Sequence, residues 1–184
     1  MTYALLFAAA IACVNVRAPE LCADLLNLQA RDSAVRLERL GNWRDPIAAA
    51  RMRAVDEENL ACLEMLLRDH GWPRASDVGE QASVAAWTLI EHGSLDLQRR
   101  YIDEMTIAAD NGELSWSLLA TTIDRMLVRE GKPQRYGTQF ALRGGAWVPE
   151  PIDDPAHVDE RRAHAGLRPL AEYAATINAT YMKR

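Results

Sequence analysis

The sequence predicts a mainly α fold, a single domain of five to seven packed helices with one small β-hairpin near residues 135–152. Apolar residues recur at helical spacing through most of the first 130 residues. Pro, Ser, Asp and Gly stand where these helices would begin and end. Alanine is abundant and there are only two phenylalanines, which suits close-packed helices better than a large sheet.

Length and charge narrow the class of protein. A chain of 184 residues has the length of one domain and can bury a sizeable core. Its net charge is -5, and the sequence contains no long run of basic residues. Because affinity for a phosphate backbone comes largely from clustered Lys and Arg, we expect no nucleic-acid partner.

The N-terminus resembles an export signal in part. Residues 3–16, YALLFAAAIACVNV, are apolar apart from Asn15, too few to span a bilayer and about as many as a secretory core segment. The positively charged segment that usually precedes such a core is missing. Val16 and Ala18, two residues apart, suit a cleavage site, and residues 10–13, which end at Cys13, loosely resemble a lipoprotein box. We therefore expect a leader over residues 1–18 before a helical domain over residues 19–184.

The leader decides the expected location. With it, the protein is periplasmic or extracellular and touches a membrane only through that leader or a lipid anchor. The alternative is a cytoplasmic protein with a buried N-terminal helix. Removal of the leader would leave Cys22 and Cys62, which either form a disulfide in an oxidising compartment or serve as two small buried apolar residues.

Two long helices are predicted next. The first covers residues 19–40, with proline in its first turn and glycine just past its end. Its apolar stripe contains Asp32. A carboxylate facing a core must be paired or hydrogen-bonded, so Asp32 either has a buried partner or turns to solvent beside Arg36 at i+4.

The second long helix is expected after the Asp45-Pro46 cap and ends near His70. Asp56 and Asn59 occupy inward positions of this helix. The sequence Gly71-Trp72-Pro73 then breaks the chain, and Trp72 either covers the end of the core or contributes to a site.

Three shorter helices follow, over residues 78–92, 95–110 and 113–130. His92 continues the apolar stripe of the first, where a lone histidine is more often structural than catalytic. Gln98 lies inward on the second. Asp124 and Arg125 lie beside the apolar stripe of the third helix. Such positions either line the wall of a cavity or mark the ordinary boundary between core and surface.

The helical period stops after Gly131. Two extended runs, residues 135–142 and 146–152, flank Arg143-Gly144-Gly145 and predict the hairpin. In a regular strand Tyr136 and Thr138 share one face and Gln139 takes the other. Gly137 permits a bulge or a close approach to a ligand. Two further helices are expected, one ending at Gly166 and one beginning at Pro169.

Strong signatures of cofactor and metal chemistry are missing from the sequence. There is no CxxC pair, HExxH, P-loop, GxGxxG or GxSxG, so no cofactor is predicted. His157 and His164, seven apart on one short helix, have the character of a solvated face, and we expect no metal site there.

Polar residues that interrupt helical stripes, or that lie on the irregular segment, form the candidate site, because sequences depart from their packing rules mostly at functional sites. His92 and Asp124 are the catalytic candidates. The candidates for substrate binding are Asp32, Trp72, Gln98, Arg125, Tyr136, Thr138 and Gln139. Histidine can transfer a proton near neutral pH, and a carboxylate, Asp124 or Asp32, can orient it.

A string of motifs runs in order from about residue 20 onward. It includes His70-Gly71-Trp72-Pro73, Glu91-His92, Asp124-Arg125, Gly131-Lys132-Pro133-Gln134, Tyr136-Gly137-Thr138-Gln139, Pro151-Ile152-Asp153-Asp154 and Val158-Asp159-Glu160-Arg161-Arg162. This string resembles a bacterial family of uncharacterised domains. The resemblance implies that most candidate positions belong to the family's shared pattern. Glu91 and Ser33 stand where that pattern often has glutamine.

Two functions of different classes follow from these residues. The first is an exported bacterial protein with a polar cleft for a small molecule or peptide, with hydrolysis by His92 as general base as one candidate reaction. The second is a non-catalytic binding or interaction module whose inward polar residues form a structural hydrogen-bond network. The sequence does not define an oligomeric state.

Overall fold

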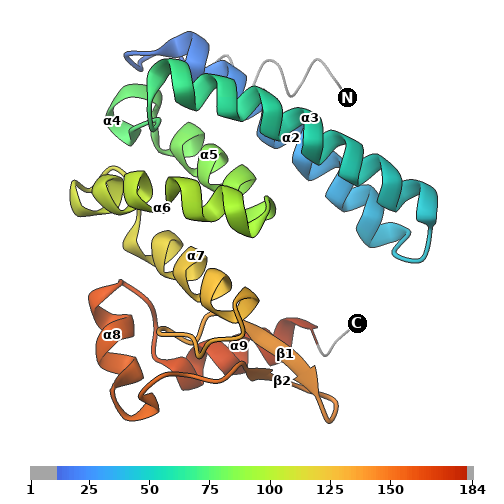
Figure 1. Cartoon of the computed structure of the whole chain (residues 1–184), viewed down its shortest axis with the longest axis vertical. Coiled ribbons are helices and arrows are strands. Elements are labelled where there is room, and N and C mark those ends of the chain that lie inside the picture. The colour runs from blue at the N-terminus through green and yellow to red at the C-terminus, as the bar shows by residue number, and fades with distance from the viewer. Residues whose placement is uncertain (1–11, 182–184) are drawn as a thin grey trace. The chain divides into compact units, whose positions relative to one another are not determined.

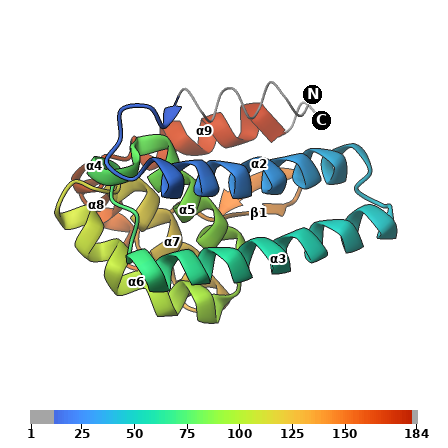
Figure 2. The ribbon, with the colours of Figure 1, turned by 90° about the horizontal axis from the view of Figure 1, so that it is seen from above.

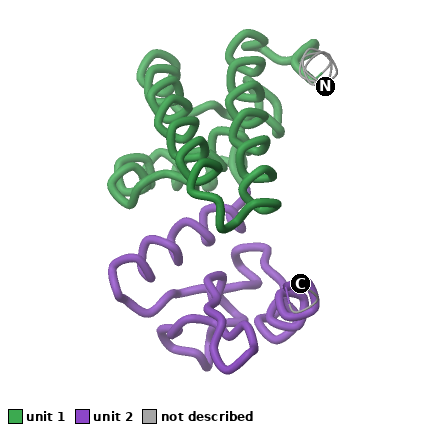
Figure 3. The backbone as a smooth tube through the Cα atoms, turned by 90° about the vertical axis from the view of Figure 1, so that its right-hand side faces the viewer, with its two compact units in different colours: residues 1–114 green, residues 115–184 purple. Residues whose placement is uncertain are grey.

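The computed structural model describes residues 12–181, and the chain divides into two compact units, Met1–Leu114 and Ser115–Arg184 (Figure 3). Its described part contains eight α-helices and one two-stranded antiparallel hairpin. The mainly α fold with one small hairpin is therefore confirmed. The domain boundary expected after residue 18 stays a prediction.

The first unit is built on two long helices. Its elements are α2 (Pro19–Gly41), α3 (Pro46–His70), α4 (Ala75–Val78), α5 (Glu80–His92) and α6 (Leu95–Asp110). A short turn brings α2 and α3 side by side, and α5 packs against both (Figures 1 and 2). The apolar stripes meet in the core, where Leu25, Leu63 and Leu89 are at most 2% exposed.

In the second unit, an irregular segment at residues 135–138 is hydrogen-bonded to the first helix of the unit. The elements of this unit are α7 (Trp116–Arg129), β1 (Phe140–Arg143), β2 (Ala146–Pro149), a 3₁₀ turn η1 (Pro155–His157), α8 (Val158–His164) and α9 (Leu170–Tyr181). Arg143 pairs with Ala146 across the two-residue turn Gly144-Gly145. Both glycines have positive φ, 59° and 83°, as a turn that matches the twist of a hairpin requires.

Several predicted boundaries move for identifiable reasons. The helix predicted over residues 78–92 is divided into α4 and α5 at Gly79, whose φ is 83°. Helix α7 begins at Trp116 rather than at Glu113, because Ser115 accepts a hydrogen bond from the backbone N–H of Ser117 and caps it. The first strand begins at Phe140 rather than at residue 135.

The disulfide considered between Cys22 and Cys62 is wrong. Cys22 is bonded to Cys13, with 5.8 Å between their Cα atoms, and Cys62 is a free thiol. Cys13 lies within the expected leader, residues 1–18, so the sequence offers only Cys22 and Cys62 for a disulfide in the mature chain. Residues 1–11 of that leader lie outside the described part of the chain. None of the helices within residues 12–181 is long and apolar enough to cross a bilayer.

We expect Asp45→Ala to lower the free energy of unfolding by about 1 kcal/mol, the usual effect of losing a helix N-cap. The Asp45 carboxylate accepts a hydrogen bond of 2.9 Å from the backbone N–H of Ile47 at the start of α3. Urea unfolding followed by circular dichroism measures the change. Glu57→Ala, at an exposed position within α3, is the control, and equal stability of the two variants would contradict the prediction.

Candidate functional site

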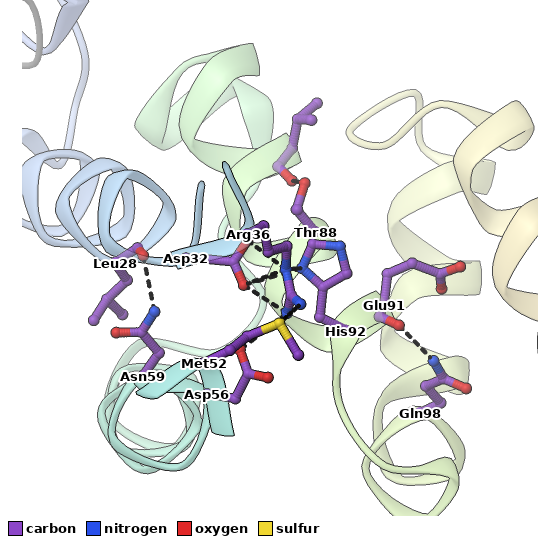
Figure 4. A network of polar contacts seen from close by, with 11 residues as sticks. Leu28, Asp32, Arg36, Met52, Asp56, Asn59, Thr88, Glu91, His92 and Gln98 are labelled. Carbon is purple, nitrogen blue, oxygen red and sulfur yellow. Dashed lines mark hydrogen bonds and ion pairs between the residues drawn. The ribbon is translucent and has the colours of Figure 1, made fainter. Parts of the chain in front are cut away.

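A polar cluster joins three helices of the first unit. Asp32 and Arg36 come from α2, Met52 and Asp56 from α3, and His92 from the last residue of α5 (Figure 4). The positions arise from helical spacing, since Asp32 and Arg36 are one turn apart and both face α3 and α5. All five side chains point toward one another in the close-up.

Arg36 is the centre of this cluster. Its Nε donates to the two carboxylate oxygens of Asp32 at 3.0 and 3.1 Å, and its Nη2 lies 2.9 Å from Asp56 Oδ1. Its Nη1 lies 3.4 Å from the sulfur of Met52. Asp32 is only 2% exposed. The interpretation of Asp32 as a buried, paired carboxylate is therefore confirmed. The alternative in which Asp32 turns to solvent is wrong, although the i+4 pairing with Arg36 that it included is present.

His92 contacts the same carboxylate. Its Nδ1 lies 3.0 Å from Asp32 Oδ1 and 2.9 Å from Arg36 Nε. A carboxylate oxygen can only accept, so we assign the ring proton to Nδ1, with Arg36 Nε directed at Asp32. Neutral His92 then carries its lone pair on Nε2. The side chain is 29% exposed, so solvent reaches the imidazole.

The two carboxyl groups have opposite pKa shifts. Burial raises the pKa of Asp32, but hydrogen bonds from His92 and Arg36 and their positive charges outweigh it, so the pKa is lowered overall. For Asp56, burial is again the largest cause and the neighbouring Asp32 charge adds to it, so its pKa is raised despite Arg36. Asp32 therefore stays ionised to a lower pH than Asp56.

A narrow depression lies against this cluster. It is lined by Asp32, Asp56, Asn59, Leu60, Leu89 and His92, and it has no room to enclose a water molecule. Asn59 is fully buried and donates to the backbone carbonyl of Leu28 at 2.9 Å. A ligand at His92 would therefore contact the outer edge of the cluster. No group of three or more His, Cys, Asp or Glu within residues 12–181 is arranged to hold a metal ion.

Asp124 forms a separate polar centre in the second unit. It is fully buried, and its Oδ1 accepts from the backbone N–H groups of Arg135 at 2.7 Å and Tyr136 at 2.9 Å. Its Oδ2 accepts from the backbone N–H and the hydroxyl of Thr138, at 2.8 and 2.9 Å. These N–H groups are unavailable to a strand ladder, which explains why β1 begins only at Phe140.

Gly137 lies at the turn of this segment. Its φ is 69°, and a Cβ there would lie 2.8 Å from a methyl carbon of Leu170. Gln139 follows, with its side-chain nitrogen 3.1 Å from the Thr138 hydroxyl and its backbone N–H bonded to Gln134. The close approach that the sequence suggested at Gly137 is therefore made by a packed leucine of α9.

Two residues of this centre escaped the sequence analysis. Gln134 is fully buried and donates to the carbonyl of Gln139, just before β1, at 3.0 Å and to that of Glu150, just after β2, at 2.8 Å. Arg162 is also fully buried, donates to the Tyr136 carbonyl at 2.6 Å and lies over the ring of Tyr173. Both residues belong to the string of motifs, which was the signal available for them, and no helical periodicity marks Arg162.

The remaining candidate residues lie elsewhere. Trp72 lines a cavity of about 540 Å³ in the first unit together with Arg74, Glu104, Ile107, Ala108, Asn111 and Glu113. Gln98 is fully buried and donates to the backbone carbonyl of Glu91. Arg125 is half-buried on α7. One depression is thus shared by Asp32, Asp56, Asn59 and His92. The expected convergence of His92 with Asp124, Arg125 and Gln139 stays a prediction.

The chain belongs to a family of unknown function (DUF6624), whose model matches residues 19–184. The resemblance to a family of uncharacterised domains is thereby confirmed. No curated protein and no solved structure matches the chain.

The lowered pKa of Asp32 predicts a pH-dependent contribution to stability. A carboxyl whose pKa is lower in the folded state stabilises it above the unfolded pKa, and this contribution disappears as the pH falls through the folded pKa. Between about pH 5 and pH 2, the free energy of unfolding should therefore fall less steeply for Asp32→Asn than for the wild type. Urea unfolding across this range measures both slopes, and Asp96→Asn, at an exposed carboxylate, should keep the wild-type slope.

Asp124→Asn should destabilise the protein by about 3 kcal/mol, since the amide replaces a charged acceptor of four short hydrogen bonds and turns an N–H₂ group toward N–H donors. Thermal unfolding measures the loss. Glu160→Gln, an exposed neutralisation in the same unit, should have no such effect. A loss as small as that of the control would show that the segment does not depend on the carboxylate.

Proposed function

We propose that this member of the family is an exported protein that binds a small molecule or peptide at the outer edge of the Asp32–Arg36–His92 cluster, with His92 as general base. The observation that carries the proposal is the 3.0 Å contact between Asp32 Oδ1 and His92 Nδ1, whose imidazole is partly exposed to solvent. A carboxylate in this position fixes the ring orientation and the tautomer.

The proposed chemistry is proton abstraction by Nε2. A water molecule at the partly exposed ring donates its proton to Nε2, and its oxygen bonds to the carbonyl carbon or phosphorus of an ester. The bond from that atom to the leaving oxygen then breaks, and the leaving group departs as an alcohol with the proton that His92 had taken up. The ionised Asp32 carboxylate stabilises the imidazolium that forms, and its lowered pKa keeps it ionised throughout. Asp124 has a full set of hydrogen bonds in the other unit, so we assign the orienting role to Asp32.

Arg36 has a positioning role in this proposal. It holds Asp32 against His92 through Nε and ties Asp56 to the same group through Nη2. Its side chain is 25% exposed, so one edge of the guanidinium can also meet an anionic group of the substrate. The charged groups of the cluster, two carboxylates against one arginine and one histidine, favour a substrate without a large negative charge.

The disulfide bears on export. Disulfides persist mainly in oxidising compartments, and the Cys13–Cys22 bond supports a periplasmic or extracellular location. Cleavage after Ala18 would remove Cys13 and with it the disulfide. We therefore propose that the protein is exported and that no signal peptidase cleaves it between Cys13 and Cys22.

A structural network is the second candidate. Arg36 of α2 bonds Asp56 and Met52 of α3 and lies against His92 of α5, so the same contacts fix the register of three helices. The narrowness of the adjacent depression favours this function. In that case the protein is a non-catalytic binding or interaction module.

His92→Ala separates the two functions. The purified chain is incubated with a metabolite extract, a peptide library and chromogenic ester and phosphoester substrates, and depletion is followed by mass spectrometry and absorbance. For a general base we expect the rate on the depleted substrate to fall at least about 100-fold, with stability within about 1 kcal/mol of the wild type.

His164→Ala, which removes an exposed histidine of α8, should change neither quantity. The catalytic proposal is contradicted if His92→Ala leaves every depletion rate unchanged, or if no substrate is depleted by the wild type. A stability loss of a few kcal/mol together with unchanged rates would instead identify the structural network.

A further inference from the structure

The turn between α2 and α3 carries an exposed apolar surface. The side chains of this turn are Leu37, Leu40, Trp43 and Ile47, which are 70%, 62%, 62% and 71% exposed. We call these four residues the hairpin tip, after the helical hairpin that α2 and α3 form. They account for four of the nine large apolar side chains that are strongly exposed in the described part of the chain, and they fall within eleven consecutive residues. Scattered exposed leucines need no explanation, but a concentration such as this marks an interaction surface.

The first two turns of α3 make the surroundings of the hairpin tip basic. Between residues 37 and 47 the charges balance, with Arg39 and Arg44 against Glu38 and Asp45. Arg51 and Arg53 of α3 add a surplus of two positive charges in a chain of net charge -5, and Arg51 lies 3.1 Å from the Glu38 carboxylate, which places it beside the tip. The Arg44 guanidinium lies 4.4 Å from the ring centroid of Trp43. An exposed tryptophan is thus placed directly beside a cation.

Within the first unit, the tip stands apart from the other helices. Helix α5 has 13 residues against 23 and 25 in α2 and α3, and it packs on the half of the pair away from their turn (Figure 2). The turn end of this pair of helices therefore projects past α5, and no helix within residues 12–114 covers its apolar side chains.

We propose that the hairpin tip docks on the surface of a lipid bilayer that contains anionic phospholipids. Tryptophan is favoured at the boundary between headgroups and acyl chains, where Leu37, Leu40 and Ile47 can bury their apolar surface. The arginines meet the lipid phosphates. A second copy of the chain fits less well, because two tips would bring surpluses of the same charge together. This docking does not depend on the function proposed for His92.

Sedimentation with vesicles tests the proposal on the full chain. One set of vesicles is phosphatidylcholine alone, and the other contains phosphatidylglycerol as about one third of the lipid. We expect binding to the anionic vesicles, weakened by high salt, and little binding to the neutral ones. The double variant Leu40→Ser/Trp43→Ser should bind at least about tenfold more weakly.

Arg44→Gln/Arg53→Gln, which removes charge and keeps the apolar tip, should also weaken binding to anionic vesicles about tenfold or more. Leu142→Ser is the matched control, since Leu142 is 60% exposed on β1, in the other unit, and its loss should leave binding unchanged. Thermal melts confirm that each variant folds.

Several outcomes overturn the proposal. If the wild-type protein remains in the supernatant with both kinds of vesicle, the hairpin tip is not a membrane-docking surface. Equal binding by the wild type and the tip variant places the lipid contact elsewhere. Sedimentation velocity gives the third outcome, since a dimer that the Leu40→Ser/Trp43→Ser substitutions dissociate, without vesicle binding, would make the tip an interface between two copies.

Discussion

A carboxylate that is removed from water must be supplied with hydrogen-bond donors, and Asp32 in the first compact unit and Asp124 in the second are both removed from water. Asp32 is 2% exposed and Asp124 is fully buried. An unpaired buried charge would cost more free energy than a domain of this size has to spare, so the chain around each carboxylate is held in the conformation that supplies donors. The irregular segment after α7 and the meeting of α2 with α5 both follow from this requirement.

The two carboxylates meet the requirement in different ways. Asp124 takes its donors from the backbone of residues 135–138 and from the Thr138 hydroxyl, which fixes a loop and leaves its oxygens fully used. Asp32 takes its donors from the side chains of Arg36 and His92, and these side chains are still partly exposed. Only the second arrangement leaves a titratable group in contact with solvent. This difference is the reason for assigning chemistry to His92 and Asp32 and a structural contribution to Asp124.

The candidate site illustrates what a stripe of residues can and cannot predict. Helical spacing placed Asp32, Asp56, Asn59 and His92 on inward faces, and these residues do line one depression. Spacing gives the face of a helix but not its partner, so it could not show that Arg36 would connect all three helices. The assumption of a regular strand failed between residues 135 and 139, because a distant carboxylate competes for the same backbone N–H groups.

The sequence by itself determined the helices, since caps, proline and glycine positions and apolar periodicity act within a few residues of one another. The ends of α3 and α6 at Asp45, Gly71, Ser94 and Asn111 follow from such local chemistry. Only the tertiary structure decided the partners of the buried polar groups, the pairing of Cys22 with Cys13, and the exposure of the hairpin tip. These depend on which segments meet across 9 to 60 residues of chain, and no local pattern encodes that meeting.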